Sequence, residues 1–138
     1  MKLLTFQASR FSWKPFSKTL EDARDPGPER EVSDCVVAFV HAEARDMAED
    51  RRQSVFRQTL KHLKWLANKG ALRTLVLHSF THLGGENADP AWAKAFMNAL
   101  DERLTHTGYD VRQTPFGHLC EWDLGVCGHS LGRVWKEI

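Results

Sequence analysis

The sequence predicts a single α/β domain, in which one β-sheet carries two main helices packed on it. Short apolar runs rich in β-branched residues alternate with two longer segments of helical periodicity. A glycine follows each helical segment, as is common at helix ends. The chain has 138 residues, of which 42% are hydrophobic and 27% are charged, the usual balance of one globular domain with its own core. We therefore expect residues 1–138 to form one domain.

The first part of the chain predicts two strands and a connection. Residues 2–8 are apolar and too few for a helix, and Phe11 and Trp13 continue an alternating pattern after them. Residues 21–31 are acidic and rich in proline and glycine, which indicates an exposed loop. Residues 34–41 form a near-continuous apolar run, typical of a strand that is covered on both faces.

Two amphipathic helices follow. Leucines recur at helical spacing over residues 46–69, and Gly70 is a natural C-terminal cap for that helix. Asp89 and Pro90 supply an N-cap and a first-turn proline to a second helix that runs to about residue 107.

Three further strands complete the pattern. Residues 72–78 are short and apolar and lie between the two helices, while residues 109–113 and 116–126 follow the second helix. The element order is mostly β followed by βαβαββ.

Charge and cysteine content limit the classes of function. The formal net charge is only +1, so any nucleic-acid binding must come from a local patch. Three cysteines cannot all pair within one chain, which fits a reducing cytoplasm. No signal peptide is indicated, and no segment approaches the roughly 20 apolar residues of a membrane span. We expect a cytoplasmic protein without a membrane partner.

Three segments together carry a resemblance to a known family: residues 77–83 (LHSFTHL), 88–91 (ADPA) and 108–117 (GYDVRQTPFG). In order and spacing they resemble the archaeal-type editing domain of threonyl-tRNA synthetase, where a Tyr-Ala-His-Leu loop precedes a helix and a Gly-Tyr-Glu-Val strand leads to Ala-Pro-Phe-Gly. Residues 127–131 (CGHSL) are similar to the closing Lys-Gly-His-Pro-Leu of that family. The resemblance covers roughly residues 70–131.

The resemblance implies the fold of D-aminoacyl-tRNA deacylases, commonly a homodimer, and hydrolysis of seryl-tRNA mischarged on threonine tRNA. Such editing exists because one methyl group changes binding by only about 1–3 kcal/mol, so a synthetic site cannot fully reject serine. The implied partners are aminoacyl-tRNA and a separate threonyl-tRNA synthetase, and no cofactor is implied. Since the sequence shows no synthetase segments, we expect an editing-type hydrolase that acts alone.

The residues of the implied site are partly kept and partly replaced. His82 matches the pocket histidine of the family, whereas its Trp-Tyr-Lys becomes His118-Leu119-Cys120 here. Gln7 stands at the position of an N-terminal histidine. The expected catalytic residues are His82, His118 and Cys120. The expected substrate-binding residues are Gln7, Thr81, Phe116 and Gly117.

Other interpretations remain open beside this one. Without the family's lysine and tyrosine, the chain could be a non-catalytic binding module that recognises an aminoacyl-tRNA end, a nucleotide or a protein. Cys120 is a thiolate nucleophile only if a neighbouring cation lowers its pKa, and is otherwise a small buried strand residue. His78 is expected to pack or hydrogen-bond in the core. A hairpin centred at residues 123–124 would bring four potential zinc ligands together: His118, Cys120, Cys127 and His129.

Basic and aromatic residues raise the question of RNA contact. Six basic residues decorate the first helix and could meet tRNA phosphates or simply be solvated: Arg51, Arg52, Arg57, Lys61, Lys64 and Lys69. Trp65 and Trp92 fall within helices and are expected to pack there. Trp13 and Trp122, outside the helices, are candidates for base stacking, although packing in the core is the default for them.

Overall fold

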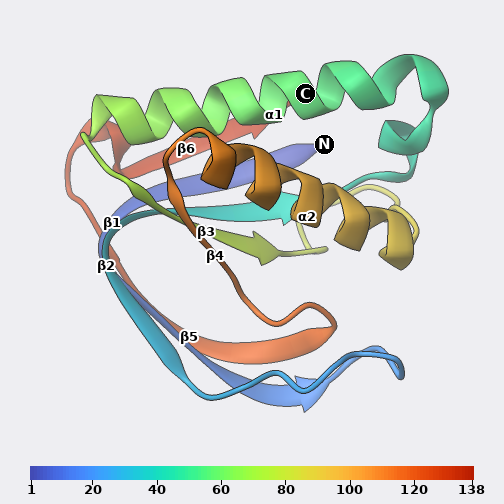
Figure 1. Ribbon diagram of the computed structural model, residues 1–138, viewed down its shortest axis with the longest axis horizontal. Helices are drawn as coiled ribbons and strands as arrows, with labels where there is room; N and C mark the ends of the chain where they lie inside the picture. The colour runs from blue at the N-terminus through green and yellow to red at the C-terminus, as the bar shows by residue number, and fades with distance from the viewer.

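The computed structural model describes residues 1–138 and contains a mixed six-stranded sheet with two main helices (Figure 1). The strands are β1 (Lys2–Lys18), β2 (Arg30–His41), β3 (Thr74–Ser79), β4 (Asp110–Gln113), β5 (His118–Val126) and β6 (Arg133–Glu137). The helices are α1 (Glu49–Lys69) and α2 (Pro90–His106), with short 3-10 turns η1 (Ala44–Met47) and η2 (Ser130–Gly132). The predicted α/β class, with two main helices on one sheet, is confirmed.

The sheet has the order β4-β3-β2-β1-β5, and β6 also pairs with β1. Strands β2, β3 and β4 are parallel, and α1 and α2 form the connections between them. Strand β1 is long enough to pair with β6 through its first half and with β5 through its second half. Register shifts mark the β1–β5 pairing, and Figure 1 shows β5 and the far ends of β1 and β2 curving away from the helices.

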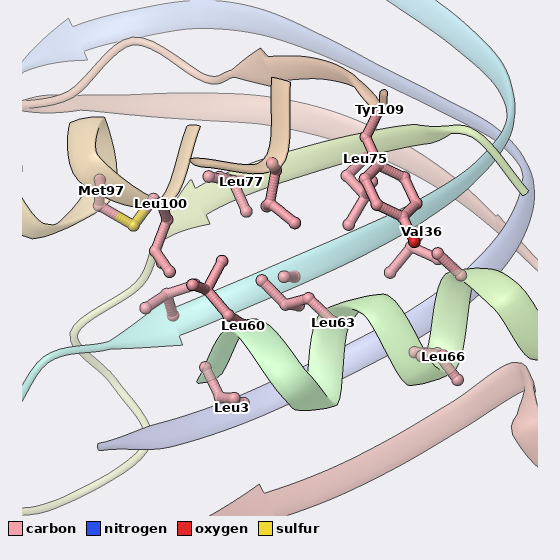
Figure 2. Packing of buried hydrophobic residues seen from close by; sticks show 14 of the residues in the cluster. Leu3, Val36, Leu60, Leu63, Leu66, Leu75, Leu77, Met97, Leu100 and Tyr109 are labelled. Atoms are coloured by element: carbon pink, nitrogen blue, oxygen red, sulfur yellow. The ribbon is translucent and has the colours of Figure 1, made fainter. Parts of the chain in front are cut away.

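The main core lies between the helices and one face of the sheet (Figure 2). Leu3, Val36 and Leu75 come from the sheet, and Leu63 and Leu100 from the helices, all fully buried. Their side chains can meet because every second residue of a strand points to the same face, while the leucines of α1 recur once per turn.

A second and smaller core occupies the opposite face of the same strands. Phe11 and Trp13 from the curved part of β1 are buried there against Val37, Phe39 and Val76. Strand β2 is therefore covered on both faces, as its near-continuous apolar run predicts.

Several element boundaries differ from those expected. Strand β1 continues to Lys18 because β5 pairs with it from Ala8 to Lys18, while β2 pairs with it as far as Trp13. Helix α1 begins at Glu49, after the separate turn η1. Strand β6 was not expected, since its five residues, mostly exposed, carry little apolar signal. The start of α2 is confirmed, since the Asp89 carboxylate accepts a hydrogen bond from the Trp92 N–H at 3.0 Å.

Gly70 is the C-cap of α1 as predicted, but it does not adopt the left-handed conformation for which glycine is usually selected at helix ends. Its φ is −92°, and the residue with positive φ is Ala71. A Cβ on Gly70 would lie 2.8 Å from the side-chain nitrogen of Gln7. The glycine is therefore required by close packing against β1. The expectation that Trp65 packs inside is wrong, because 41% of its surface is exposed.

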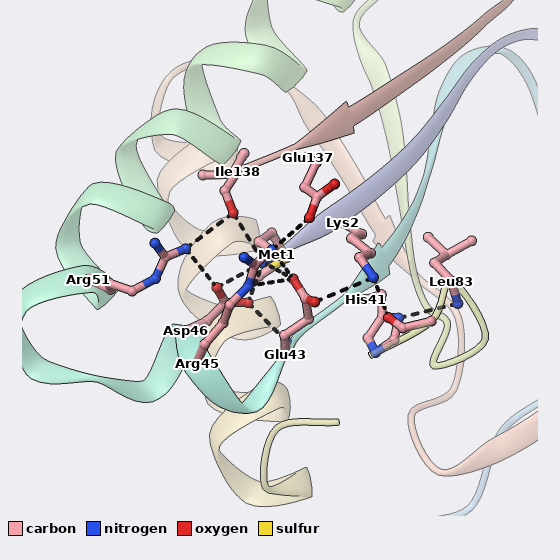
Figure 3. Close-up of polar contacts among 11 residues, drawn as sticks. Met1, Lys2, His41, Glu43, Arg45, Asp46, Arg51, Leu83, Glu137 and Ile138 are labelled. Carbon is pink, nitrogen blue, oxygen red and sulfur yellow. Dashed lines mark hydrogen bonds and ion pairs between the residues drawn. The ribbon is translucent and has the colours of Figure 1, made fainter. Parts of the chain in front are cut away.

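A buried ionic cluster joins the start of β1 to η1 (Figure 3). The Met1 ammonium donates to Glu43 Oε2 at 2.6 Å and to Asp46 Oδ1 at 2.8 Å. Burial alone would raise the pKa of the Glu43 carboxyl, but hydrogen bonds from Met1 and Arg45 lower it to about 2. These contacts hold η1 and the start of α1 against the sheet. Neither helix has the length and apolar character needed to cross a membrane.

Candidate functional site

A pocket of about 570 Å³ lies between the end of β3, the start of α2 and the start of β5. Its walls come from residues 78–82, 87–93 and 115–120, with Trp122 beyond them. The first and third segments follow the carboxyl ends of the parallel strands β3 and β4, which lie side by side at one edge of the sheet. Ligand sites of α/β sheets commonly form just beyond the carboxyl ends of such parallel strands.

The pocket brings together six of the seven residues that the sequence singled out: Thr81, His82, Phe116, Gly117, His118 and Cys120. Thr81 and His82 belong to the loop after β3, and the other four precede or begin β5. The two groups are distant in the sequence and meet only through the sheet order. Their convergence is a property of the fold that the motifs alone did not guarantee.

Gln7 is the expected site residue that lies elsewhere. It is buried on the helix side of β1, where its Nε2 donates to the Leu66 carbonyl at 2.7 Å. The same side chain packs against Gly70. The Leu66 carbonyl also accepts from the Gly70 N–H at 3.3 Å, so Gln7 adds a second hydrogen bond at the end of α1. Gln7 does not line the pocket.

Aromatic rings line one wall of the pocket, and they pack against the buried ring of Phe39. Phe39 is at the centre of this cluster, with ring centroids 5.3 Å from Trp122, 4.8 Å from His78 and 5.1 Å from Phe80. His82 packs edge-on against Phe80 at 5.3 Å. The wall is therefore apolar and rigid, and carries two imidazoles.

His78 is the pocket residue that the sequence undervalued. Its Nδ1 lies 2.8 Å from the Thr114 hydroxyl, as expected of a hydrogen-bonded strand histidine, yet its ring also lines the pocket. Burial lowers its pKa to about 4, so the ring is neutral at physiological pH. The sequence contains a signal for this position. His78, Phe80 and His82 are spaced two residues apart, which in an extended chain places their side chains on the same side.

The loop that carries His82 is fastened to the sheet (Figure 3). The Leu83 N–H donates to His41 Nδ1 at 3.2 Å, and Lys2 Nζ donates to the Gly84 carbonyl at 2.6 Å. Burial lowers the pKa of His41, which keeps Nδ1 available as an acceptor. The exposed His82 therefore stands on a tethered loop.

Cys120 and His118 share one face of β5, two residues apart. Burial raises the pKa of the Cys120 thiol, and no neighbouring cation opposes this effect. The condition for a thiolate, a cation that lowers the pKa, is therefore not met, and Cys120 is a neutral thiol at pH 7. His118 Nδ1 is buried without a hydrogen-bond partner, which leaves one polar atom at this wall unsatisfied.

Gly117 closes the pocket beside the loop that follows β1. Its φ is +80°, a conformation that favours glycine, and its carbonyl accepts from the Thr19 N–H at 2.8 Å. A Cβ here would lie 2.9 Å from that of Ala23. Because the carbonyl is already used, Gly117 shapes the wall and does not offer that group to a ligand.

The alternative zinc site does not form. Strand β5 runs without a turn from His118 to Val126, close to the single strand expected over residues 116–126, so the alternative hairpin at residues 123–124 is absent. No group of three or more histidine, cysteine or acidic side chains is arranged to hold a metal ion, and all three cysteines are free.

Comparisons with known proteins agree with this architecture. A family model described as the Archaea-specific editing domain of threonyl-tRNA synthetase matches residues 1–138. Threonine-tRNA ligases of Methanosphaerula palustris and Staphylothermus marinus are each 28% identical, over 139 and 142 residues. These matches cover all of this chain but 22% of each ligase, so the chain spans about a fifth of their length.

A solved structure shows the same fold at low sequence identity. The c-Myc DNA unwinding element binding protein superimposes with a TM-score of 0.67 at 15% identity, covering 100% of this chain and 99% of its own. At that identity the likeness concerns the fold alone, which is the D-aminoacyl-tRNA deacylase fold that the resemblance implied. Because the family model matches residues 1–138 of the chain, the chain belongs to the archaeal editing-domain family of threonyl-tRNA synthetase.

Proposed function

We propose that this domain is an editing-type hydrolase that cleaves the ester bond of mischarged aminoacyl-tRNA, with seryl-tRNA(Thr) as its first substrate. The observation that carries the proposal is the convergence of Thr81, His82 and residues 116–120 on one pocket with an aromatic wall. The family to which the chain belongs supports the same chemistry.

In the proposed reaction the nucleophile is water. Its oxygen bonds to the ester carbonyl carbon, the bond from that carbon to the ribose oxygen breaks, and a water proton ends on the ribose oxygen. His82, at the pocket rim, orients the water or the ester. His78 is held by Thr114 through one ring nitrogen, and offers the other as a neutral hydrogen-bonding group. The neutral thiol of Cys120 is a wall residue in this scheme.

Selection of serine over threonine would depend on shape. One additional methyl group is worth only about 1–3 kcal/mol in a well-fitting pocket, but a rigid wall can refuse it altogether. Phe80 and Trp122 line such a wall, and the buried ring of Phe39 packs against both of them. If the wall excludes the methyl group of threonine, the pocket needs no additional charged group to select serine.

The proposal includes a cellular setting. The domain would act in the cytoplasm, on tRNA charged by a separate threonyl-tRNA synthetase, and would form a homodimer. Sedimentation velocity over a range of protein concentrations tests the dimer: a single species at the mass of one chain would contradict it.

A second candidate, a non-catalytic binding module, is favoured by one specific observation. Burial raises the pKa of Cys120, which occupies the position of the family's lysine, so that position supplies neither a cation nor a thiolate at pH 7. In this alternative the same pocket holds an aminoacyl end without turnover.

Deacylation of charged tRNA separates the two candidates. Wild-type protein added to seryl-tRNA(Thr) and threonyl-tRNA(Thr) should release serine selectively, and His82→Ala should lower that rate by about 10²-fold, the range of a lost proton-handling or orienting group. His106→Ala, on the exposed end of α2, is the matched control and should leave the rate unchanged.

Binding is measured in parallel with seryl-3′-aminoadenosine, whose amide link resists hydrolysis. Binding without turnover in wild-type protein would favour the binding module. Equal deacylation rates for wild type and His82→Ala would show that His82 has no role in the reaction.

A further inference from the structure

Helix α1 is strongly basic, although the chain as a whole is nearly neutral. From Arg51 to Lys69 it contains six basic residues and no acidic residue. Arg51 and Arg52 pair with Asp46 and Glu49. The remaining four take part in none of the chain's ion pairs: Arg57, Lys61, Lys64 and Lys69. A nearly neutral protein thus has one strongly basic helix.

A groove of about 450 Å³ lies between this helix and β6. Its lining residues are Gln58, Lys61, His62, Trp65, Val134 and Lys136. No carboxylate lines the groove, and none of these residues lines the pocket beside His82. The groove is therefore separate from the candidate active site, and its charge is uncompensated.

An ordered aromatic platform stands in the groove. Trp65 stacks on His62 with ring centroids 5.9 Å apart and an interplanar angle of 30°. The Thr5 hydroxyl donates to the Val134 carbonyl at 3.0 Å, so it accepts from His62 Nε2 at 3.2 Å. Burial and the nearby Lys136 lower the pKa of His62, so this ring is neutral. His62 thereby braces Trp65, of which 41% remains exposed.

We propose that the groove between α1 and β6 binds a nucleic-acid strand, with a base stacked on Trp65 and phosphates beside Lys61 and Lys136. An exposed, braced aromatic ring between unpaired lysines is the arrangement by which proteins hold unpaired bases, since every base has a π-face and every link a negative charge. An acidic protein segment would use the lysines but gives no reason for the exposed ring. This site goes beyond ester hydrolysis and does not depend on it.

Two probes test the site by fluorescence titration: an uncharged tRNA(Thr) transcript and a twelve-nucleotide single-stranded oligouridylate. We expect Trp65→Ala to weaken binding by about 5- to 150-fold, the range for one lost base stack. Trp65→Phe should keep most of the affinity. Trp135→Ala is the matched control, because Trp135 is 50% exposed on the other face of β6 and should leave binding unchanged.

The lysines are tested by the dependence of binding on salt. For the oligonucleotide, a Lys61→Ala, Lys136→Ala variant should lower the slope of log affinity against log salt by roughly 1.4, which is 0.7 for each lost phosphate contact. Binding of both probes would identify a general single-strand site, and binding of tRNA alone a site for the folded molecule; both support the proposal.

Three results would overturn it. The first is no binding of either probe at 50 mM salt. The second is unchanged affinity in both Trp65→Ala and Trp65→Phe, with wild-type circular dichroism and melting temperature to show that the variants are folded. The third is dissociation of a homodimer by Trp65→Ala in sedimentation velocity, since a second copy of the chain would then occupy the groove.

Discussion

The two faces of the same sheet have opposite characters. On the helix side Leu75 and Leu77 of β3 pack into a closed aliphatic core, whereas on the other side Val76 and His78 face aromatic rings and a pocket. The difference arises from single-residue alternation along one strand. One face gains its stability from tight burial, while the other gives up part of that burial to leave space for a ligand.

The largest expected contrast between the faces is in the effect of truncation. Leu63→Ala in α1 should lower the free energy of unfolding by about 2–5 kcal/mol, because the surrounding side chains cannot close around the lost methyl groups. Leu119→Ala at the pocket should change it by less than about 0.5 kcal/mol, since half of that side chain is already in solvent. Urea unfolding monitored by circular dichroism measures both. Similar losses for the two variants would mean that the pocket side is as tightly packed as the core.

The faces should also differ in their response to acid. The pKa of His78 is about 4, below its ordinary value of 6.5, so the unfolded state takes up a proton first as the pH falls. Its contribution is full above pH 6.5 and is lost between about pH 6.5 and 4, for roughly 3 kcal/mol. The pKa of Glu43 is about 2 against 4.5, so its contribution is lost between about pH 4.5 and 2, for roughly 3 kcal/mol.

Unfolding free energies measured between pH 7 and 2 separate the two windows. His78→Gln should reduce the loss in the upper window only, where His41 and His62, whose pKa values are also lowered, still contribute. Glu43→Gln should reduce the loss in the lower window only. The control Glu121→Gln, on the exposed part of β5, should leave both slopes as they are. A Glu43→Gln curve parallel to wild type below pH 4.5 would show that the ionic cluster around Met1 does not lower the pKa of Glu43.

Much of the fold could be predicted from local patterns. The run at residues 34–41 and the Asp89-Pro90 start of α2 each have a signal within a few residues, and both appear as expected. Strand β6 has no such signal, because its short, mostly exposed sequence becomes a strand only through pairing with β1. Trp65 was expected to be buried because it lies on an amphipathic helix. The sequence does not show that β6, the strand beside this part of α1, leaves the ring partly exposed.

The candidate site was predicted to a similar degree. His82 and residues 116–118 come from motifs and meet in the pocket. Gln7 does not line this pocket, because alignment to a family position says nothing about the face of the strand, and its side chain points to α1. His78 was undervalued because its burial, its bond to Thr114 and its place on the pocket wall depend on three separate strands.

The smallest expected effect concerns how the pocket wall is closed, and two glycines allow a matched test. Gly108 and Gly117 have φ of +94° and +80°, so alanine introduces left-handed strain of about 1–2 kcal/mol at either position. A Cβ on Gly108 meets open space, whereas one on Gly117 meets Ala23 at 2.9 Å and Leu20 at 3.2 Å. Gly117→Ala should therefore cost up to about 1 kcal/mol more in unfolding free energy than Gly108→Ala.

The pocket should register this difference more clearly than stability does. Because Leu20 lines the pocket, displacing it in Gly117→Ala should weaken binding of seryl-3′-aminoadenosine, whereas Gly108→Ala should bind like wild type. Isothermal titration with both variants measures this. Equal affinities would show that the loop after β1 yields to a methyl group without reshaping the wall, and that the aromatic face, with His78 and Phe80, sets the size of the pocket by itself.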